Sequence, residues 1–348
     1  MLARLRNTYI FCFIILISMG AKAQDPVFSQ FYASGLYINP AMAGVEPNWA
    51  LSLNHRNQWK QIAGNPYVTT QASFIVPFYQ KDVDQRHWGG AGVSVFNDNA
   101  GIGSLRSTGA NASLAYNLPV SSMHSVLFAL QVGFINKSVN TNFQWGGQFD
   151  PNTPGGISQG TGIGQVSGLI GSRLFLDAGA GFMYYFNAGR DYEKKGASAY
   201  FGAAANHLNA PNQSLIEGQN ETLPLLIKGH GGFEVHVSSK LNFSPNFIYA
   251  RQDLNDQLNL GAYFTVLLNQ NETLLAPQNF ILGGWYRLDD AIIGSIGFSN
   301  SFYTLGFSYD ANAQNLGGIS NGKGAYEISL KITRPRPGKT VRFYTPRI

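Results

Sequence analysis

Residues 125–134 read Ser-Val-Leu-Phe-Ala-Leu-Gln-Val-Gly-Phe, and this pattern decides the fold. Large apolar residues such as Val126 and Leu130 alternate with small or polar residues such as Gln131 and Gly133. Successive side chains of a β-strand point to opposite faces, so the pattern places an apolar row on one face and a small or polar row on the other. A run of about ten residues is the length that a tilted strand needs to cross the hydrocarbon of a bilayer.

Similar alternating runs recur along most of the chain. There are about fourteen of them, and bacterial outer-membrane barrels have an even number of strands. The runs lie near residues 49–59, 67–78, 87–97, 105–118, 124–136, 173–186, 197–207, 222–237, 240–250, 257–268, 278–288, 291–299, 302–311 and 324–333. The sequence therefore predicts an all-β fold, a transmembrane antiparallel β-barrel of about 14 strands formed by residues 48–333.

A soluble antiparallel sandwich shows the same alternation with its apolar row turned inward. The runs here are longer than the five or six residues or so of an ordinary strand, and their second rows contain Gly, Ser, Asn and Gln. Charged residues are 12% of the chain and aromatic residues 13%, and Gly accounts for 40 of the 348 residues. Soluble domains carry about a quarter charged residues, so this composition favours a barrel in the outer membrane.

The first 23 residues have the features of a signal peptide. Arg4 and Arg6 precede an apolar stretch, Tyr9–Met19, that is too short to span a membrane, and Ala21–Ala23 supplies a small-x-small cleavage site. Loss of residues 1–23 removes Cys12, the only cysteine, and lowers the formal charge from +5 to +2. We therefore expect an exported protein without disulfides, and we expect no nucleic-acid partner.

Two end segments lie outside the predicted barrel. Residues 24–47 are aromatic and apolar, and an uncovered apolar segment is a liability, so we expect it either to plug the lumen or to bind a partner in the periplasm. Residues 334–348 form a basic periplasmic tail, which contains Arg334, Arg336, Lys339, Arg342 and Arg347 and no acid. Such a basic patch attracts acidic proteins or phosphates.

Loop lengths indicate the orientation of the barrel. If the first strand runs outward, the long polar stretches 140–172, 208–221 and 311–323 fall outside the cell, and the short turns 119–123, 238–240 and 300–301 fall in the periplasm. Outer-membrane barrels have short periplasmic turns and longer outer loops. Residues 269–278 and 289–290 do not follow this trend. The composition of residues 140–172 predicts a mobile loop.

Candidate catalytic motifs do not fit their structural context. Residues 156–160 and 318–322 both match G-x-S-x-G, but each copy lies in a Gly-rich loop with no helical pattern after it, whereas a nucleophilic serine needs a sharp strand-to-helix turn. The six histidines form no metal-binding pattern. We therefore expect a protein that is not an enzyme and that binds no cofactor or metal.

Several motifs along the mature chain resemble the PorP/SprF family of the type IX secretion system. The matching motifs are Asp25-Pro26-x-Phe28-Ser29-Gln30-Phe31-Tyr32, Leu36-Tyr37-Ile38-Asn39-Pro40-Ala41-Met42-Ala43-Gly44, Arg56-x-Gln58-Trp59, Asn97-Asp98-x-Ala100-Gly101, Leu305-Gly306-Phe307-Ser308-Tyr309-Asp310 and Gly324-Ala325-Tyr326-Glu327-Ile328-Ser329-Leu330. The N-terminal motif is long and specific, and the strand motifs alone are weak.

The resemblance implies a non-enzymatic outer-membrane component of type IX secretion and gliding machinery. Its implied partners are other type IX components and a secreted or surface adhesin with a C-terminal secretion domain, and a barrel also contacts outer-membrane lipid. The role implied is to anchor a partner surface protein or to assist its export. We expect the partner to bind the N-terminal motif through Asp25, Pro26, Phe28, Gln30, Phe31, Tyr32, Tyr37, Asn39 and Pro40.

The alternative is an outer-membrane channel for small solutes. A barrel of about fourteen strands is near the size at which the lumen fills with water unless it is plugged. A selective pore is expected to carry rings of charge, whereas the charges predicted to face the lumen are few and include Arg106, Asp177, Glu234 and Glu327. Residues 25–44 discriminate between the two functions, because passive conduction is not expected if they fill the lumen.

Overall fold

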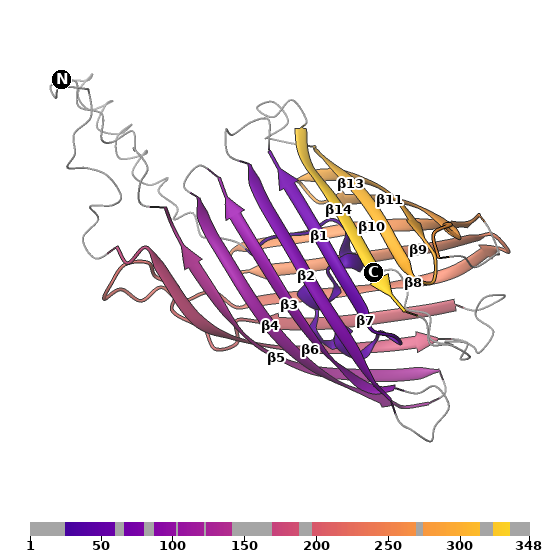
Figure 1. Cartoon of the computed structure of the whole chain (residues 1–348), viewed down its shortest axis with the longest axis horizontal. Coiled ribbons are helices and arrows are strands. Elements are labelled where there is room, and N and C mark those ends of the chain that lie inside the picture. Colours follow the sequence, from indigo (N-terminus) through magenta and orange to yellow (C-terminus); the bar gives the residue numbers. More distant parts are fainter. Residues whose placement is uncertain are drawn as a thin grey trace, which may run out of the picture.

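The computed structural model is a closed antiparallel barrel of 14 strands (Figure 1). Each strand pairs with its neighbours in sequence, and β1 closes the barrel against β14. The strands are β1 (Ala50–Gln58), β2 (Tyr67–Tyr79), β3 (His87–Ala100), β4 (Leu105–Pro119), β5 (His124–Ser138), β6 (Ser172–Asn187), β7 (Ala197–Asn206), β8 (Leu226–Ser238), β9 (Leu241–Gln252), β10 (Asn255–Leu267), β11 (Asn279–Arg287), β12 (Ala291–Ser299), β13 (Tyr303–Asn312) and β14 (Lys323–Thr333). The predicted fold and strand number are confirmed.

The structure describes residues 25–59, 66–79, 87–101, 104–121, 123–140, 169–187, 197–268, 274–313 and 323–334. The predicted signal peptide, nearly all of the loop at 140–172, the basic tail after Arg334 and both G-x-S-x-G matches lie outside these residues. In the part of the chain that is described, no helix is long and apolar enough to cross a bilayer.

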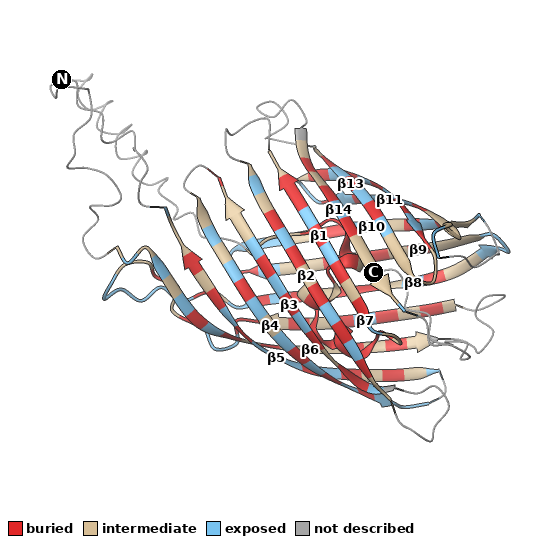
Figure 2. Cartoon of the chain, in the orientation of Figure 1, coloured by how far each residue is buried: buried red, intermediate tan, exposed pale blue. Residues whose placement is uncertain are grey.

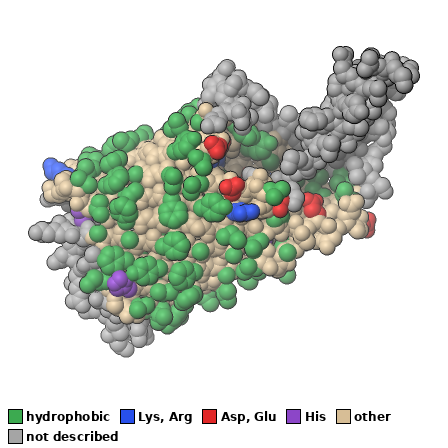
Figure 3. Space-filling view, turned by 180° about the vertical axis from the view of Figure 1, so that it is seen from behind, with side chains coloured by type: hydrophobic (Ala, Val, Ile, Leu, Met, Phe, Trp, Pro, Cys, Tyr) green, Lys and Arg blue, Asp and Glu red, His purple; other side chains and the backbone are tan. Residues whose placement is uncertain are grey.

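The alternation seen in the sequence sets the two faces of the barrel wall. In β12, Ala291 and Ile293 are buried and Ile292 and Ile296 are exposed, and Figure 2 shows the same banding along most strands. The outward row is apolar, as in Leu130, which is 69% exposed. Figure 3 shows apolar side chains spread over this wall. Because the buried row is rich in Ser, Asn and Gln, the apolar row faces lipid, and the wall is that of a membrane barrel.

The two ends of the barrel differ in their connections. We call the end at which β1 begins and β14 ends the terminal rim, and the opposite end the loop rim. Residues 139–171, 207–225 and 313–322 connect strands at the loop rim, and 120–123, 239–240 and 300–302 do so at the terminal rim. Residues 268–278 lie at the terminal rim and 288–290 at the loop rim, so the expected parity holds although their lengths run against the trend.

Three of the four charges predicted to face the lumen do so. Asp177, Glu234 and Glu327 are buried on the inner face of the wall. Arg106 is different, because it lies exposed on the row of β4 that also contains Leu114, which faces outward. The prediction for Arg106 is wrong. Its place next to the loop rim, at the start of β4, explains how an outward-facing charge is tolerated there, since charge on the outer wall costs little near the edge of the bilayer.

Residues 25–47 lie inside the barrel, where Figure 1 shows them as a dark indigo coil. We call residues 25–47 the lumen segment. It contains three short helical turns, η1 (Phe31–Ala33), α2 (Gly35–Ile38) and η2 (Pro40–Gly44). Of the two positions expected for these residues, the lumen is the observed one.

Candidate functional site

The lumen segment runs the length of the barrel. At the loop rim, the backbone N–H of Asp25 donates to the side-chain carbonyl of Gln252, the last residue of β9, at 3.1 Å. Near the terminal rim, Glu46 forms an ion pair with Lys331 of β14. The segment therefore passes through the lumen from one rim to the other before β1 begins at Ala50.

Apolar side chains of the segment belong to the larger of the two buried apolar clusters among the described residues. Phe31, Leu36, Ile38 and Met42 are at most 6% exposed. They share one cluster with inward-facing wall residues, which include Leu127, Met183, Tyr263 and Trp285. Full burial of a side chain of this size stabilises a fold by about 1.5–3 kcal/mol, so these four residues alone hold the segment strongly.

Two wall glycines leave room that the segment occupies. A Cβ at Gly90 of β3 would lie 2.0 Å from the backbone oxygen of Ala43, and a Cβ at Gly306 of β13 would lie 1.7 Å from the hydroxyl of Tyr32. Both distances are shorter than any van der Waals contact. Part of the unusual glycine content of the chain is therefore explained by the close approach of the segment to the wall.

Glu327 of β14 holds the segment by its backbone. Its carboxylate accepts the N–H of Ser29 at 2.7 Å and the N–H of Gln30 at 2.8 Å, and also the side-chain amide of Asn54 at 2.7 Å. The side chain of Glu327 is fully buried. Hydrogen bonds to a buried carboxylate are about twice as strong as neutral ones, so one wall residue fixes two successive peptide groups.

The same carboxylate belongs to a charge cluster, which consists of Arg56, Arg287, Asp290, Asp310 and Glu327. Arg56 contacts Asp310 at 2.8 Å and Glu327 at 3.3 Å, and Arg287 contacts Asp310 at 3.2 Å and Asp290 at 3.0 Å. Except for Asp290, these side chains are at most 4% exposed. Buried charges are tolerated only when paired, and here the two buried arginines balance the buried carboxylates of Asp310 and Glu327.

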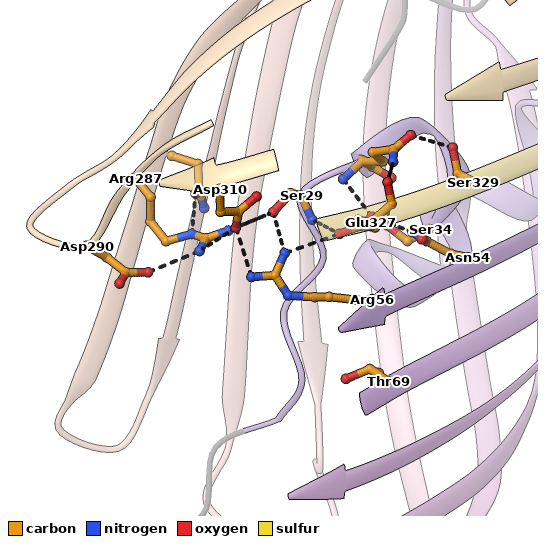
Figure 4. Close-up of polar contacts among 12 residues, drawn as sticks. Ser29, Ser34, Asn54, Arg56, Thr69, Arg287, Asp290, Asp310, Glu327 and Ser329 are labelled. Carbon is orange, nitrogen blue, oxygen red and sulfur yellow. Dashed lines mark hydrogen bonds and ion pairs between the residues drawn. The ribbon is translucent and has the colours of Figure 1, made fainter. Parts of the chain in front are cut away.

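Ser29 of the lumen segment lies at the centre of this cluster (Figure 4). Its hydroxyl accepts hydrogen bonds from Arg56 at 2.6 Å and from Arg287 at 3.0 Å, and it donates to Asp310 at 2.8 Å. The segment thus completes a polar network whose other members come from β1, β11, the β11–β12 turn, β13 and β14.

Two buried amides fix the segment further along. The Gln30 amide donates to the backbone oxygen of Glu327 at 2.7 Å, and its carbonyl accepts from Tyr32 and from Ser329. The Asn39 amide donates to the backbone oxygens of Phe182 and Ala203, and its carbonyl accepts the N–H of Ala41 at the start of η2. Asn39 thus caps a helical turn and attaches it to β6 and β7.

The loop-rim end of the segment is held by a histidine. His207, directly after β7, contacts Asp177 at 2.8 Å and Asp25 at 3.0 Å. Burial lowers the pKa of His207, but its hydrogen bonds to the two carboxylates outweigh this and raise that pKa from 6.5 to about 9. Burial also raises the pKa of Asp25, but the hydrogen bond and the charge of His207 lower it from 3.8 to about 2. Near neutral pH, His207 is therefore a cation between two carboxylates.

Residues 207–225 fold back over this end of the lumen. Leu223 is 1% exposed and packs with Phe96, Ile135 and Phe175 of the wall and with Tyr37 of the segment. Lys228 of β8 donates to the backbone oxygen of Tyr37 at 2.7 Å. The β7–β8 connection and the segment therefore close the lumen together at the loop rim.

The structure brings all nine predicted partner-binding residues together in the lumen. Phe28, Gln30, Phe31, Asn39 and Pro40 are buried, and Asp25, Pro26, Tyr32 and Tyr37 are partly exposed. Their contacts described above are with the wall, with the β7–β8 connection and within the segment, and partner binding through them stays a prediction.

Sequence reasoning did not identify Arg56, Arg287, Asp310 or His207 as parts of the site. A usable signal was present, because Arg56 and Asp310 are charged residues at inward positions of strands with an otherwise uncharged inner row. Within the described residues, no group of three His, Cys, Asp or Glu side chains is placed to hold a metal ion.

Comparison with known proteins gives a family match. The model of the family described as "Type IX secretion system membrane protein PorP/SprF" matches residues 20–332. No curated protein matches the chain. Similar solved structures include the Ralstonia pickettii toluene transporter TbuX and the Pseudomonas putida toluene transporter TodX. Each is 11% identical with a TM-score of 0.45, over 86% of this chain and 92% of the other. A further one is the KdgM porin, at 6% identity and a TM-score of 0.36, over 82% of this chain and 99% of that chain.

Proposed function

Because the chain belongs to the PorP/SprF family of type IX secretion system membrane proteins, we propose that it is a plugged anchor, which holds a partner surface protein or assists its export. The protein lies in the outer membrane as a 14-strand barrel. In this proposal it acts without catalysis, and its partners are other type IX components and an exported or surface protein with a C-terminal secretion domain.

The observation that supports an anchor over a solute channel is the filled lumen. The segment contacts opposite sides of the wall, as Ser29 bonds to Glu327 of β14 and Asn39 to Phe182 of β6. A solute could cross only after the segment and the β7–β8 connection had both moved. Their many buried contacts make spontaneous opening costly, since each hydrogen bond alone contributes about 0.5–1.5 kcal/mol.

The filled lumen also limits which residues of the segment a partner can contact. Phe28, Gln30 and Asn39 are fully enclosed, so in this arrangement they support the shape of the segment. Asp25 and Pro26 are partly exposed at the loop rim and are available for contact. We therefore place the partner contact of the segment at its loop-rim end, with the buried residues of the motif holding that end in position.

A gentle detergent pull-down of the tagged full-length protein from outer membranes, followed by mass spectrometry, tests the proposal. Recovery of type IX components or of a large surface protein is the expected result. Conductance of the purified barrel in a planar bilayer is the matching measurement, and we expect none. A lone barrel that conducts small ions without any added partner contradicts the anchor and favours the channel.

A further inference from the structure

The direction in which the lumen segment passes through the barrel has a topological consequence. Asp25 lies at the loop rim, where it contacts Gln252 and His207, and Glu46 lies near the terminal rim, where it pairs with Lys331. The chain therefore begins its course through the lumen at the loop rim, although β1 begins at the opposite end.

The loop rim is the cell-surface end of the barrel. Outer-membrane barrels have short periplasmic turns and longer outer loops, and the longest connections, 139–171 and 207–225, are both at the loop rim. An even number of strands places the start of β1 and the end of β14 together, at the terminal rim, which is then periplasmic.

From these two observations we infer that Asp25–Val27 lies at the cell surface. The N-terminal end of the segment is thus presented outside the cell beside residues 207–225, and the chain then runs inward through the lumen to the periplasmic rim. Asp25 is held there by a specific contact, because its carboxylate bonds to His207, which is itself fixed by Asp177.

The surface of this mouth is defined by described side chains. Asp25 is 24% exposed, and Pro26 and Val27 are partly exposed. In the connection that supplies His207, residues 217–222 are also exposed. A ligand outside the cell can therefore reach Asp25, Pro26 and Val27. This inference does not depend on the proposed function, because it concerns only the side of the membrane on which Asp25–Val27 lies.

Cysteine labelling on living cells tests the inference. In a Cys12→Ser background, no other cysteine is present, so each single-cysteine variant has one reactive thiol. The test variant is Pro26→Cys. The surface control is Leu254→Cys, in the β9–β10 turn at the loop rim, where Leu254 is 77% exposed. The periplasmic control is Lys240→Cys, in the exposed β8–β9 turn at the terminal rim.

With a membrane-impermeant maleimide, we expect Pro26→Cys to label on intact cells to the same extent as after permeabilisation, like Leu254→Cys. Lys240→Cys should label only after permeabilisation. If Pro26→Cys behaves like Lys240→Cys, the inference is wrong.

A second probe covers the case in which the Pro26 position is too enclosed to react. An epitope inserted between residues 24 and 25 should be detected by antibody on intact cells. Detection only after permeabilisation would overturn the inference. Neither probe requires a bound partner, so failure here is distinguishable from failure of the pull-down.

Discussion

The two halves of the lumen segment are held by different forces. In the first half, residues 25–32, the wall contacts are mainly ionic or charge-assisted, through His207, Glu327 and the rest of the charge cluster. In the second half, residues 36–45, which begins near the loop rim at Tyr37 and continues toward the terminal rim, they are mainly apolar contacts and close backbone approach, through Leu36 and Ala43. Apolar burial responds weakly to pH and salt, whereas ion pairs respond to pH. The halves should therefore be separable by experiment.

The difference also indicates which half could open. A buried ionic network is weak evidence for stability, because a well-packed apolar cluster of the same volume is often as stable or more stable. A buried ionic network instead specifies a single arrangement of its side chains, and the loss of one member disturbs all the others. We therefore expect the first half to respond to single changes more steeply than the second half.

The largest effect is expected for Glu327→Ala. It leaves the N–H groups of Ser29 and Gln30 buried without their acceptor and removes one of the carboxylates that balance Arg56. Removing one partner of a buried charge network costs about 3–5 kcal/mol. The free energy of unfolding in urea measures this loss, and the fluorescence of Trp285, whose ring lies 4.8 Å from that of Phe31, reports release of the segment.

Two further variants test whether the loss of stability is specific to the carboxylate of Glu327. Glu221→Ala removes an exposed carboxylate from the β7–β8 connection and should change stability by less than about 0.5 kcal/mol. Glu327→Gln keeps the size of the side chain but has only one acceptor oxygen, so we expect it not to restore stability. Full restoration by Gln would show that shape, and not charge, matters at this position.

In the apolar half, the matching change is Leu36→Ala. Leu36 is 1% exposed, and removing its buried methyl groups should cost about 2–5 kcal/mol, the range for such truncations in a core. The control is Leu130→Ala on the lipid-facing wall, where no internal cavity forms. Unfolding titrations of both variants measure the difference. Equal losses would mean that the segment contributes no more to stability than the outer wall does.

The sequence predicts the wall much better than the site. Alternation is local, so each strand can be recognised from its own residues, as at 125–134. The charge cluster depends on long-range register, because Arg56 faces Glu327 only after β1 has closed against β14. The contact between Ser29 and Glu327 joins residues 298 positions apart. No local pattern encodes such a pairing, and for this reason the sequence left open whether the segment plugs the lumen or binds a partner.

Arg106 shows where local reasoning fails in the wall itself. Inside the bilayer, an outward charge is costly, so a charged residue in a strand is rightly expected to face the lumen. Near a rim that cost is small, and the sequence pattern then does not decide whether a charged side chain faces the lumen or the outside of the barrel. Asp177 lies near the same rim and faces inward because it pairs with His207, a contact that the sequence does not reveal.

A smaller effect in the apolar half is expected for Gly90→Ala. The added Cβ would lie 2.0 Å from the backbone oxygen of Ala43, which cannot rotate away as a side chain can. Overpacking of this kind costs about 1–3 kcal/mol. Gly294→Ala is a matched control in β12, since nothing lies within 4 Å of the Cβ that it adds. If both variants unfold at the same urea concentration, η2 does not pack against β3 as described.

The smallest and most local effect is a pH dependence at the loop rim. The pKa of His207 is raised to about 9 from 6.5, so its stabilising contribution is complete below pH 6.5 and is lost as the pH rises through about 9. The pKa of Asp25 is lowered to about 2 from 3.8, so its contribution is present above pH 3.8 and is lost as the pH falls through about 2. Asp25 should therefore be held most firmly between about pH 4 and pH 6.5, and only partly by about pH 9.

Maleimide reacts faster with rising pH at any thiol, so the measurement is the labelling rate of Pro26→Cys relative to that of Leu254→Cys. We expect this ratio to increase above about pH 9 and to increase less in His207→Gln, in which the side chain cannot be charged but Lys228 and Lys137 still attract Asp25. The second half should respond less, because its contacts are mainly apolar. If the ratio rises with pH equally in His207→Gln, a group other than His207 causes the change. The ion pair between His207 and Asp25 would then not account for a difference between the two halves.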